Sequence, residues 1–94
     1  MTTHILIIED DINLSTVLAD YLQDKGYVID AATDGQEGWD LINKKHYDLL
    51  LLDIMMPRMN GWQLLKSLRD SSIPLPVIIT SGKTVRDDII RGYN

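Results

Sequence analysis

Short apolar runs alternate with helix-like patterns along this chain of 94 residues, and that alternation limits the folds it can adopt. Three runs, at residues 5–8, 49–52 and 77–79, are continuously apolar rather than alternating with polar residues. Continuous runs are typical of parallel strands that helices cover on both faces. With a more polar run at residues 27–30 as an edge strand, the order of segments predicts an α/β fold built on a parallel sheet.

The segment between the first two runs carries the clearest helical signal. Its apolar residues recur at the spacing of one helix face, namely Leu14, Val17, Leu18, Tyr21 and Leu22. Lys25 and Gly26 follow as a cationic last turn and a terminal glycine. We therefore predict a helix that has one apolar face and ends at Gly26.

Weaker signals predict three more helices. Residues 33–36 have the form of a capping box that begins at Thr33. The apolar residues expected to face inward from the second helix are Trp39, Leu41 and Ile42. Asn60 can cap a third helix, whose expected inward residues are Trp62, Leu65 and Leu68. A fourth helix is expected from Thr84, and residues 70–76 read as the loop before the last apolar run.

Composition excludes several classes of protein. With 45% hydrophobic and 24% charged residues, the chain has the make-up of a single globular domain. The absence of cysteine excludes disulfides, thiolate metal sites and a cysteine nucleophile. A net charge of −5 disfavours nucleic acid as a direct partner and suits divalent cations. No stretch resembles a membrane span or a secretory signal, so we expect a cytoplasmic location.

Carboxylates follow two of the predicted strands directly. Glu9, Asp10 and Asp11 come after the first run, and Asp53 comes after the third. In an open parallel sheet, ligands bind beyond the carboxyl ends of the strands, so these acids should share one crevice. Two like charges about 4 Å apart repel by roughly 4 kcal/mol at an effective dielectric constant near 20. A hard divalent cation such as Mg²⁺ would relieve that repulsion through oxygen ligands.

The stretches at residues 4–11, 49–61 and 76–83 together closely resemble the receiver domain of two-component response regulators. They combine an acidic pair, a strand-end aspartate, a Met-Met-Pro segment with an Asn-Gly turn, and a strand that ends in hydroxyl residues. The resemblance implies a flavodoxin-like, doubly wound parallel sheet. It also implies that residues 1–94 form one receiver domain holding four of the usual five βα units, incomplete at its C-terminus.

The resemblance also implies roles for individual residues. Asp53 would accept a phosphoryl group from the phosphohistidine of a sensor histidine kinase. Asp10, Asp53 and the backbone carbonyl of Met55 would bind Mg²⁺, with Mn²⁺ as an alternative ion, and Glu9 would act directly or through water. Ser81 would contact the phosphoryl group, with Thr80 as the alternative. Such a module is not an enzyme in the ordinary sense.

Two other functions stay open at this point. In the first, the chain lacks the lysine that receivers carry on the fifth strand, is impaired in phosphorylation, and self-associates. A second copy would cover residues 77–79 and the helix face of Leu14, Val17 and Tyr21. The strand is a candidate contact because exposed strand edges invite pairing with another chain. In the second, the chain is a Mg²⁺-dependent phosphohydrolase. Against this, position 55 holds methionine and not a second aspartate that could serve as general acid.

Overall fold

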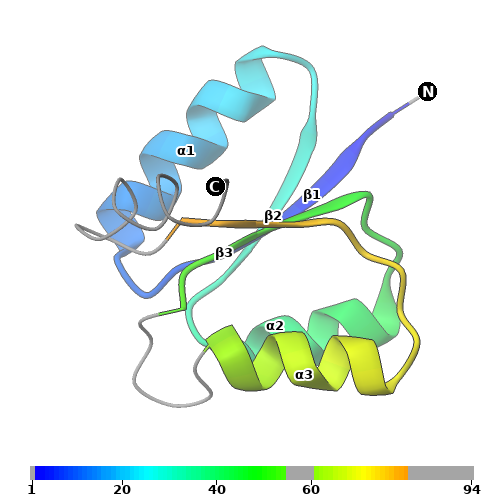
Figure 1. Ribbon diagram of the computed structural model, residues 1–94. Helices are drawn as coiled ribbons and strands as arrows, with labels where there is room; N and C mark the ends of the chain where they lie inside the picture. Colours follow the sequence, from blue (N-terminus) through cyan, green and yellow to red (C-terminus); the bar gives the residue numbers. More distant parts are fainter. Residues whose placement is uncertain (1, 55–60, 81–94) are drawn as a thin grey trace, which may run out of the picture.

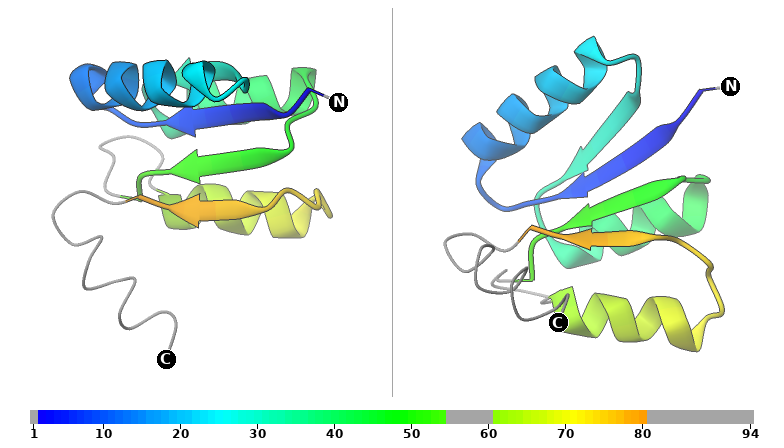
Figure 2. Two further views of the ribbon diagram at one scale, coloured as in Figure 1. Left: turned by 90° about the horizontal axis from the view of Figure 1, so that it is seen from above. Right: turned by 45° about the horizontal axis from the view of Figure 1, so that its top comes forward.

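The computed structural model describes residues 2–54 and 61–80. Within these ranges the strands form one parallel sheet in the order β2-β1-β3-β4, and their carboxyl ends point to the same edge (Figure 2). The strands are β1 (His4–Ile8), β2 (Val28–Ala32), β3 (Leu49–Leu52) and β4 (Val77–Ile79). The predicted α/β fold with flavodoxin-like strand order is confirmed.

Helices cover both faces of the sheet (Figure 1). The helix α1 (Ile12–Asp24) lies on one face, and α2 (Gly35–Lys44) and α3 (Gly61–Asp70) lie together on the other. From β1 the chain passes to β2 on one side of the sheet and then crosses to β3 and β4 on the other side. The carboxyl ends of β1 and β3 therefore flank the switch point of the sheet. No helix in the described part of the chain is long and apolar enough to span a bilayer.

Side chains of the central strands alternate between two apolar clusters. Leu6, Ile8, Leu50 and Leu52 point toward α2 and α3, and all four are fully buried. Ile5, Ile7 and Leu51 form the smaller cluster with the inner side of α1. Each fully buried side chain of this size contributes about 1.5–3 kcal/mol through burial. Burial on both faces explains why these strands are continuously apolar.

Only part of the predicted apolar face of α1 packs on the sheet. Leu18 and Leu22 contact the smaller cluster, together with Ala19. Leu14, Val17 and Tyr21 are 39%, 64% and 60% exposed, and these are the three residues expected from the sequence to be uncovered and available to a second copy. The apolar stripe of α1 is wider than the contact between the helix and the sheet. The flank that carries the three exposed residues therefore points away from the sheet. The predicted end is confirmed, because Lys25 caps the helix and Gly26 has φ +95°.

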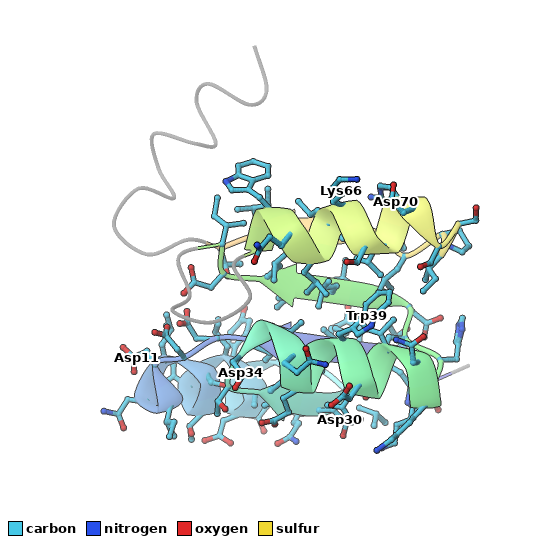
Figure 3. All side chains as sticks on the ribbon, turned by 90° about the horizontal axis from the view of Figure 1, so that it is seen from below. Asp11, Asp30, Asp34, Trp39, Lys66 and Asp70 are labelled. Atoms are coloured by element: carbon cyan, nitrogen blue, oxygen red, sulfur yellow. The ribbon has the colours of Figure 1, made fainter. Side chains whose placement is uncertain are left out.

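The start of α2 differs from its prediction. Its cap is Asp34 and not Thr33, and the Asp34 carboxylate accepts a hydrogen bond of 2.8 Å from the backbone N–H of Glu37. The Thr33 hydroxyl instead donates to the Glu37 carboxylate at 3.3 Å. Trp39 is half-buried against the larger cluster and lies on the side of α2 that faces α3 (Figure 3). Its predicted packing role is confirmed.

The buried face of α3 also differs from its prediction. Leu64 and Leu68 are fully buried, whereas Trp62 is 60% exposed and does not point inward as predicted. The helix is rotated so that Leu64, not Trp62, begins the inward row, and Leu65 is half-buried. The predicted cap Asn60 and the predicted helix from Thr84 lie outside the described residues.

Candidate metal centre

Three carboxylates meet at the carboxyl edge of the sheet. Glu9 and Asp10 follow β1, and Asp53 follows the neighbouring strand β3. Backbone pairing continues into these positions, since Asp53 N–H donates to the carbonyl of Ile8 at 3.0 Å and Glu9 N–H donates to that of Ala32 at 3.0 Å. The acids are therefore held by the register of the sheet itself, and a loose loop plays no part in placing Glu9 or Asp53.

The geometry of this group suits a single small cation. Each of Glu9, Asp10 and Asp53 offers one carboxylate oxygen, and the three oxygens lie within 4.8 Å of one another. Glu9 is 2% exposed and Asp53 is 4% exposed, whereas Asp10 faces solvent. We call Glu9, Asp10 and Asp53 the acidic triad. The structure brings these three acids together as expected, whereas Asp11, the fourth acid of that expectation, is not part of the group.

The electrostatics of the triad centre on Glu9. The pKa of Glu9 is raised from 4.5 to about 7, mainly by burial and also by the neighbouring Asp53 and Asp10 carboxylates, while the hydrogen bond from the backbone N–H of Asp11 lowers it. That N–H donates to Glu9 Oε2 at 3.1 Å. The other oxygen, Oε1, is buried and receives no hydrogen bond within the described residues. A buried acceptor without a donor is costly, so the site favours a positive partner.

The donor set selects the kind of cation. All three ligand atoms are carboxylate oxygens, which are the hard ligands that Mg²⁺ and Ca²⁺ prefer. Mg²⁺ needs only one or two carboxylates because it keeps several waters, and the exposed Asp10 leaves the triad open to solvent on one side. The orphaned oxygen of Glu9 and the oxygen-only donor set therefore fit a divalent cation of this class.

Asp11 has a structural role beside the triad. It is the N-cap of α1, and its carboxylate accepts a hydrogen bond of 3.1 Å from the backbone N–H of Leu14. The carboxylate is thus engaged by the first turn of the helix, as expected for an aspartate at this position. Figure 3 labels Asp11 at the start of α1.

One of the two predicted hydroxyl residues, Thr80, lies beside β4. Thr80 follows β4 directly, and its backbone N–H donates to the carbonyl of Leu52 at 2.8 Å. Because Leu52 pairs with Ile79, Thr80 comes next to Asp53 along the same edge. A contact between Thr80 and a phosphoryl group stays a prediction. Ser81, the preferred candidate, and Met55, the predicted carbonyl ligand, lie outside the described residues.

Two glycines contact residues next to the triad, and the sequence predicted no positioning role for either of them. Gly61 at the start of α3 and Gly38 within α2 are both buried. A glycine inside a helical pattern costs about 1 kcal/mol relative to alanine, which is a signal that packing requires it. Gly61 approaches Ile54, and Gly38 approaches Ile8, the residues next to Asp53 and Glu9 in the chain.

The histidines lie away from the acidic triad. His4 begins β1 and His46 precedes β3, so both sit at the amino edge of the sheet. The Asp48 carboxylate joins them: it accepts a hydrogen bond of 2.8 Å from the backbone N–H of His4 and lies 3.2 Å from the His46 ring. Neither imidazole is placed to serve as a base or ligand for the triad.

Comparison with known sequences gives one family. The chain matches the family model described as the response regulator receiver domain over residues 5–94. The transcriptional regulatory protein RprY of Bacteroides fragilis is 39% identical over 89 residues, which cover 95% of this chain and 38% of RprY. This chain therefore spans less than half the length of that relative.

Comparison with solved structures agrees. A receiver domain of the Francisella response regulator 1452 has a TM-score of 0.86 at 34% identity, covering 98% of this chain and 76% of that one. The response regulator TrrA of Thermotoga maritima, in complex with Mg²⁺-BeF, has a TM-score of 0.83 at 30% identity, covering 94% and 77%. TrrA has also been solved in complex with the histidine kinase ThkA, with a TM-score of 0.80 at 31% identity, covering 86% and 70%.

Proposed function

Since the chain belongs to the response regulator receiver family, we propose that it is a phosphoacceptor module in which Asp53 takes a phosphoryl group from a phosphohistidine. The observation that carries this proposal is the position of Asp53. Its carboxylate is almost fully buried at the end of a central strand, with Glu9 and Asp10 oxygens within 4.8 Å. A buried carboxylate with two acidic neighbours at a strand end is a candidate nucleophile for phosphoryl transfer.

The acidic triad would hold Mg²⁺ through Asp10 and Asp53, with Glu9 acting directly or through water. When bound, Mg²⁺ supplies positive charge that offsets the triad and the oxygens of the incoming phosphoryl group. The fit is supported by the buried Oε1 of Glu9, which has no hydrogen-bond donor among the described residues. The Met55 carbonyl remains a proposed further ligand.

The chain's own residues would position the nucleophile. One oxygen of Asp53 forms a bond to phosphorus while the bond between phosphorus and the imidazole nitrogen breaks, and the product is an acyl phosphate. Such a transfer needs in-line placement and charge neutralisation more than proton transfer. The hydrogen bond from the backbone N–H of Asp53 to the Ile8 carbonyl fixes the position of the Asp53 backbone. Thr80, at the end of the adjacent strand, is the proposed hydroxyl donor.

We infer that the phosphoryl donor is a sensor histidine kinase. The support is the solved complex of TrrA with the histidine kinase ThkA, a receiver that shares 31% identity with this chain. The module itself would turn over no external substrate. Self-association keeps one observation in its favour, namely the exposure of Leu14, Val17 and Tyr21 on α1.

Phosphorylation by a small donor tests the proposal. The full chain is incubated with acetyl phosphate and Mg²⁺, and its intact mass is then measured. We expect one added phosphoryl group in the wild type and in Asp20→Asn, an exposed aspartate on α1, and none in Asp53→Asn or in the presence of a chelator. An unchanged mass in the wild type, or equal labelling of Asp53→Asn, would overturn the assignment of Asp53.

A further inference from the structure

Gly61 allows the start of α3 to lie against the backbone that carries Asp53. A Cβ atom at position 61 would come within 2.5 Å of the Ile54 Cα atom and 2.7 Å of its Cβ. The backbone N–H of Gly61 also donates to the Ile54 carbonyl at 3.3 Å. Contacts of that length do not occur for real Cβ atoms, and a backbone atom cannot rotate away. Any larger residue at position 61 must therefore displace either α3 or the chain beside Asp53.

Gly38 plays the corresponding part on α2, but its neighbour is a side chain. A Cβ atom at position 38 would come within 2.8 Å of Ile8 Cγ1 and closer still to Ile8 Cδ1. Ile8 directly precedes Glu9, and its carbonyl accepts the hydrogen bond from Asp53 N–H. The two helices on one face of the sheet thus touch the two residues that adjoin the buried acids, each through a glycine.

We propose that Gly61 and Gly38 are positioning residues for the acidic triad. They let α3 and α2 lie directly on Ile54 and Ile8, and this contact acts together with strand pairing to set the separation of the Asp53 and Glu9 carboxylates. The inference rests on the proposed function, because it assigns these glycines to the geometry of the metal and phosphoryl site. The two glycines differ in mechanism, since Gly61 contacts backbone and Gly38 contacts a side chain.

The difference in mechanism makes the two positions respond differently to a second substitution. Ile8→Val removes Cδ1, which is the atom nearest to a Cβ at position 38, and leaves Cγ1 at 2.8 Å, so it should relieve part of the strain in Gly38→Ala. Ile54→Val leaves Cα and Cβ of residue 54 in place, so it should not relieve Gly61→Ala. A merely destabilised fold would not produce this pattern in metal affinity.

Gly26 provides a matched control. It has φ +95°, and no neighbouring atom lies within 4 Å of the place that a Cβ would take, so Gly26→Ala strains the backbone without touching a neighbour. It lies at the C-terminal end of α1, at the opposite edge of the sheet from the triad. Gly26→Ala should lower the melting temperature and leave Mg²⁺ affinity unchanged.

The experiment measures Mg²⁺ affinity by calorimetry and the Mg²⁺ dependence of labelling by acetyl phosphate, in the full chain and these variants. We expect Gly61→Ala and Gly38→Ala to weaken Mg²⁺ binding about 10–100-fold, the range seen when groups that orient metal ligands are lost. Affinity should recover in part in Gly38→Ala with Ile8→Val and stay weak in Gly61→Ala with Ile54→Val.

The remaining outcomes count against the positioning role or against the proposed function. Lower melting temperatures with unchanged Mg²⁺ affinity, as in Gly26→Ala, would overturn the positioning role alone. A wild type that neither binds Mg²⁺ nor accepts phosphate would overturn the proposed function and this inference with it. If Gly61→Ala does not fold, Gly38→Ala and its Ile8→Val rescue decide the matter: weakened and then partly restored affinity supports the role, and unchanged affinity overturns it.

Discussion

The backbone N–H of Asp53 donates a hydrogen bond of 3.0 Å to the carbonyl oxygen of Ile8, one residue beyond the paired ends of β1 and β3. Because Glu9 follows Ile8, the same bond holds the backbones of the two buried acids next to each other. Sheet register is strongly specified where both faces are buried, as they are here. The acidic triad is therefore a consequence of strand pairing in the core.

The raised pKa of Glu9 predicts how stability depends on pH without metal. The folded-state pKa is about 7 and the ordinary value is 4.5, so between these values the folded chain binds more protons than the unfolded chain. Stability should then fall as pH rises from 4.5 to 7, by an amount on the order of 3 kcal/mol, and level off above. Glu9→Gln removes the cost of ionisation, so this variant should be the more stable one at pH 8.

Urea unfolding in a chelator at pH 5 to 8 checks this prediction. The free energy of unfolding of Glu9→Gln minus that of the wild type should grow with pH up to about 7. Added Mg²⁺ at pH 8 should stabilise the wild type more than Glu9→Gln, because a ligand stabilises only the state that binds it. A difference independent of pH would contradict the account of Glu9.

Asp10 and Asp11 are neighbours with different roles, and paired substitutions separate them. Loss of a group that only orients a metal ligand costs about 10–100-fold in affinity, so losing the direct ligand in Asp10→Asn should cost no less. The chain should stay folded because Asp10 is exposed. Asp11→Ala should instead lower the unfolding free energy by about 1 kcal/mol through loss of the α1 cap.

Mg²⁺ titration and thermal melts of both variants check this separation. Asp11→Asn serves as a further control, since asparagine caps helices about as well as aspartate. Equal Mg²⁺ affinity in the wild type and Asp10→Asn would remove Asp10 from the site.

The sheet and the acidic triad were predictable from the sequence because each has a local signature. A continuously apolar run such as residues 49–52 indicates a strand buried on both faces, and the residue that follows it must lie at the carboxyl edge. Asp53 could therefore be placed beside Glu9 without coordinates. The close approach of Gly61 to Ile54 has no such signature, since it depends on the distance between two elements.

The errors in the helices have a common physical cause. Apolar residues at several phases of α3 permit more than one inward row, and packing against the sheet selects Leu64 and Leu68 while leaving Trp62 exposed. Likewise, Thr33 and Asp34 are both competent caps one residue apart. Tertiary contacts decide such choices, and a pattern of residue types alone does not contain them.

The cap of α2 can be tested directly by comparing two neighbours. Asp34→Ala removes the acceptor for Glu37 N–H and should lower the unfolding free energy by about 1 kcal/mol. Thr33→Ala removes only an exposed side-chain hydrogen bond of 3.3 Å and should change it by less than about 0.5 kcal/mol. Urea unfolding of the two variants shows which one loses more unfolding free energy. A larger loss in Thr33→Ala would mean that Thr33 is the N-cap of α2.

Tyr47 supports the amino edge of the sheet through one strong hydrogen bond. It is 6% exposed, and its hydroxyl donates to the Asp30 carboxylate on β2 at 2.7 Å. This bond, and then the Lys45 ammonium 3.1 Å from the same oxygen, hold the pKa of Asp30 below its ordinary value of 3.8. Tyr47→Phe should lower the unfolding free energy at pH 7 by about 1–2 kcal/mol, below the full worth of a charged hydrogen bond because Asp30 is partly exposed.

The pH dependence identifies the cause of that loss. A lowered folded-state pKa gives stability that is present above pH 3.8 and disappears as pH falls through the folded value. The difference in unfolding free energy between wild type and Tyr47→Phe should therefore shrink between pH 5 and pH 2, as urea unfolding across that range would show. Mg²⁺ affinity should not change, because Tyr47 precedes β3 and the acidic triad follows it. A constant difference across this range would mean that Tyr47 stabilises the fold by packing alone.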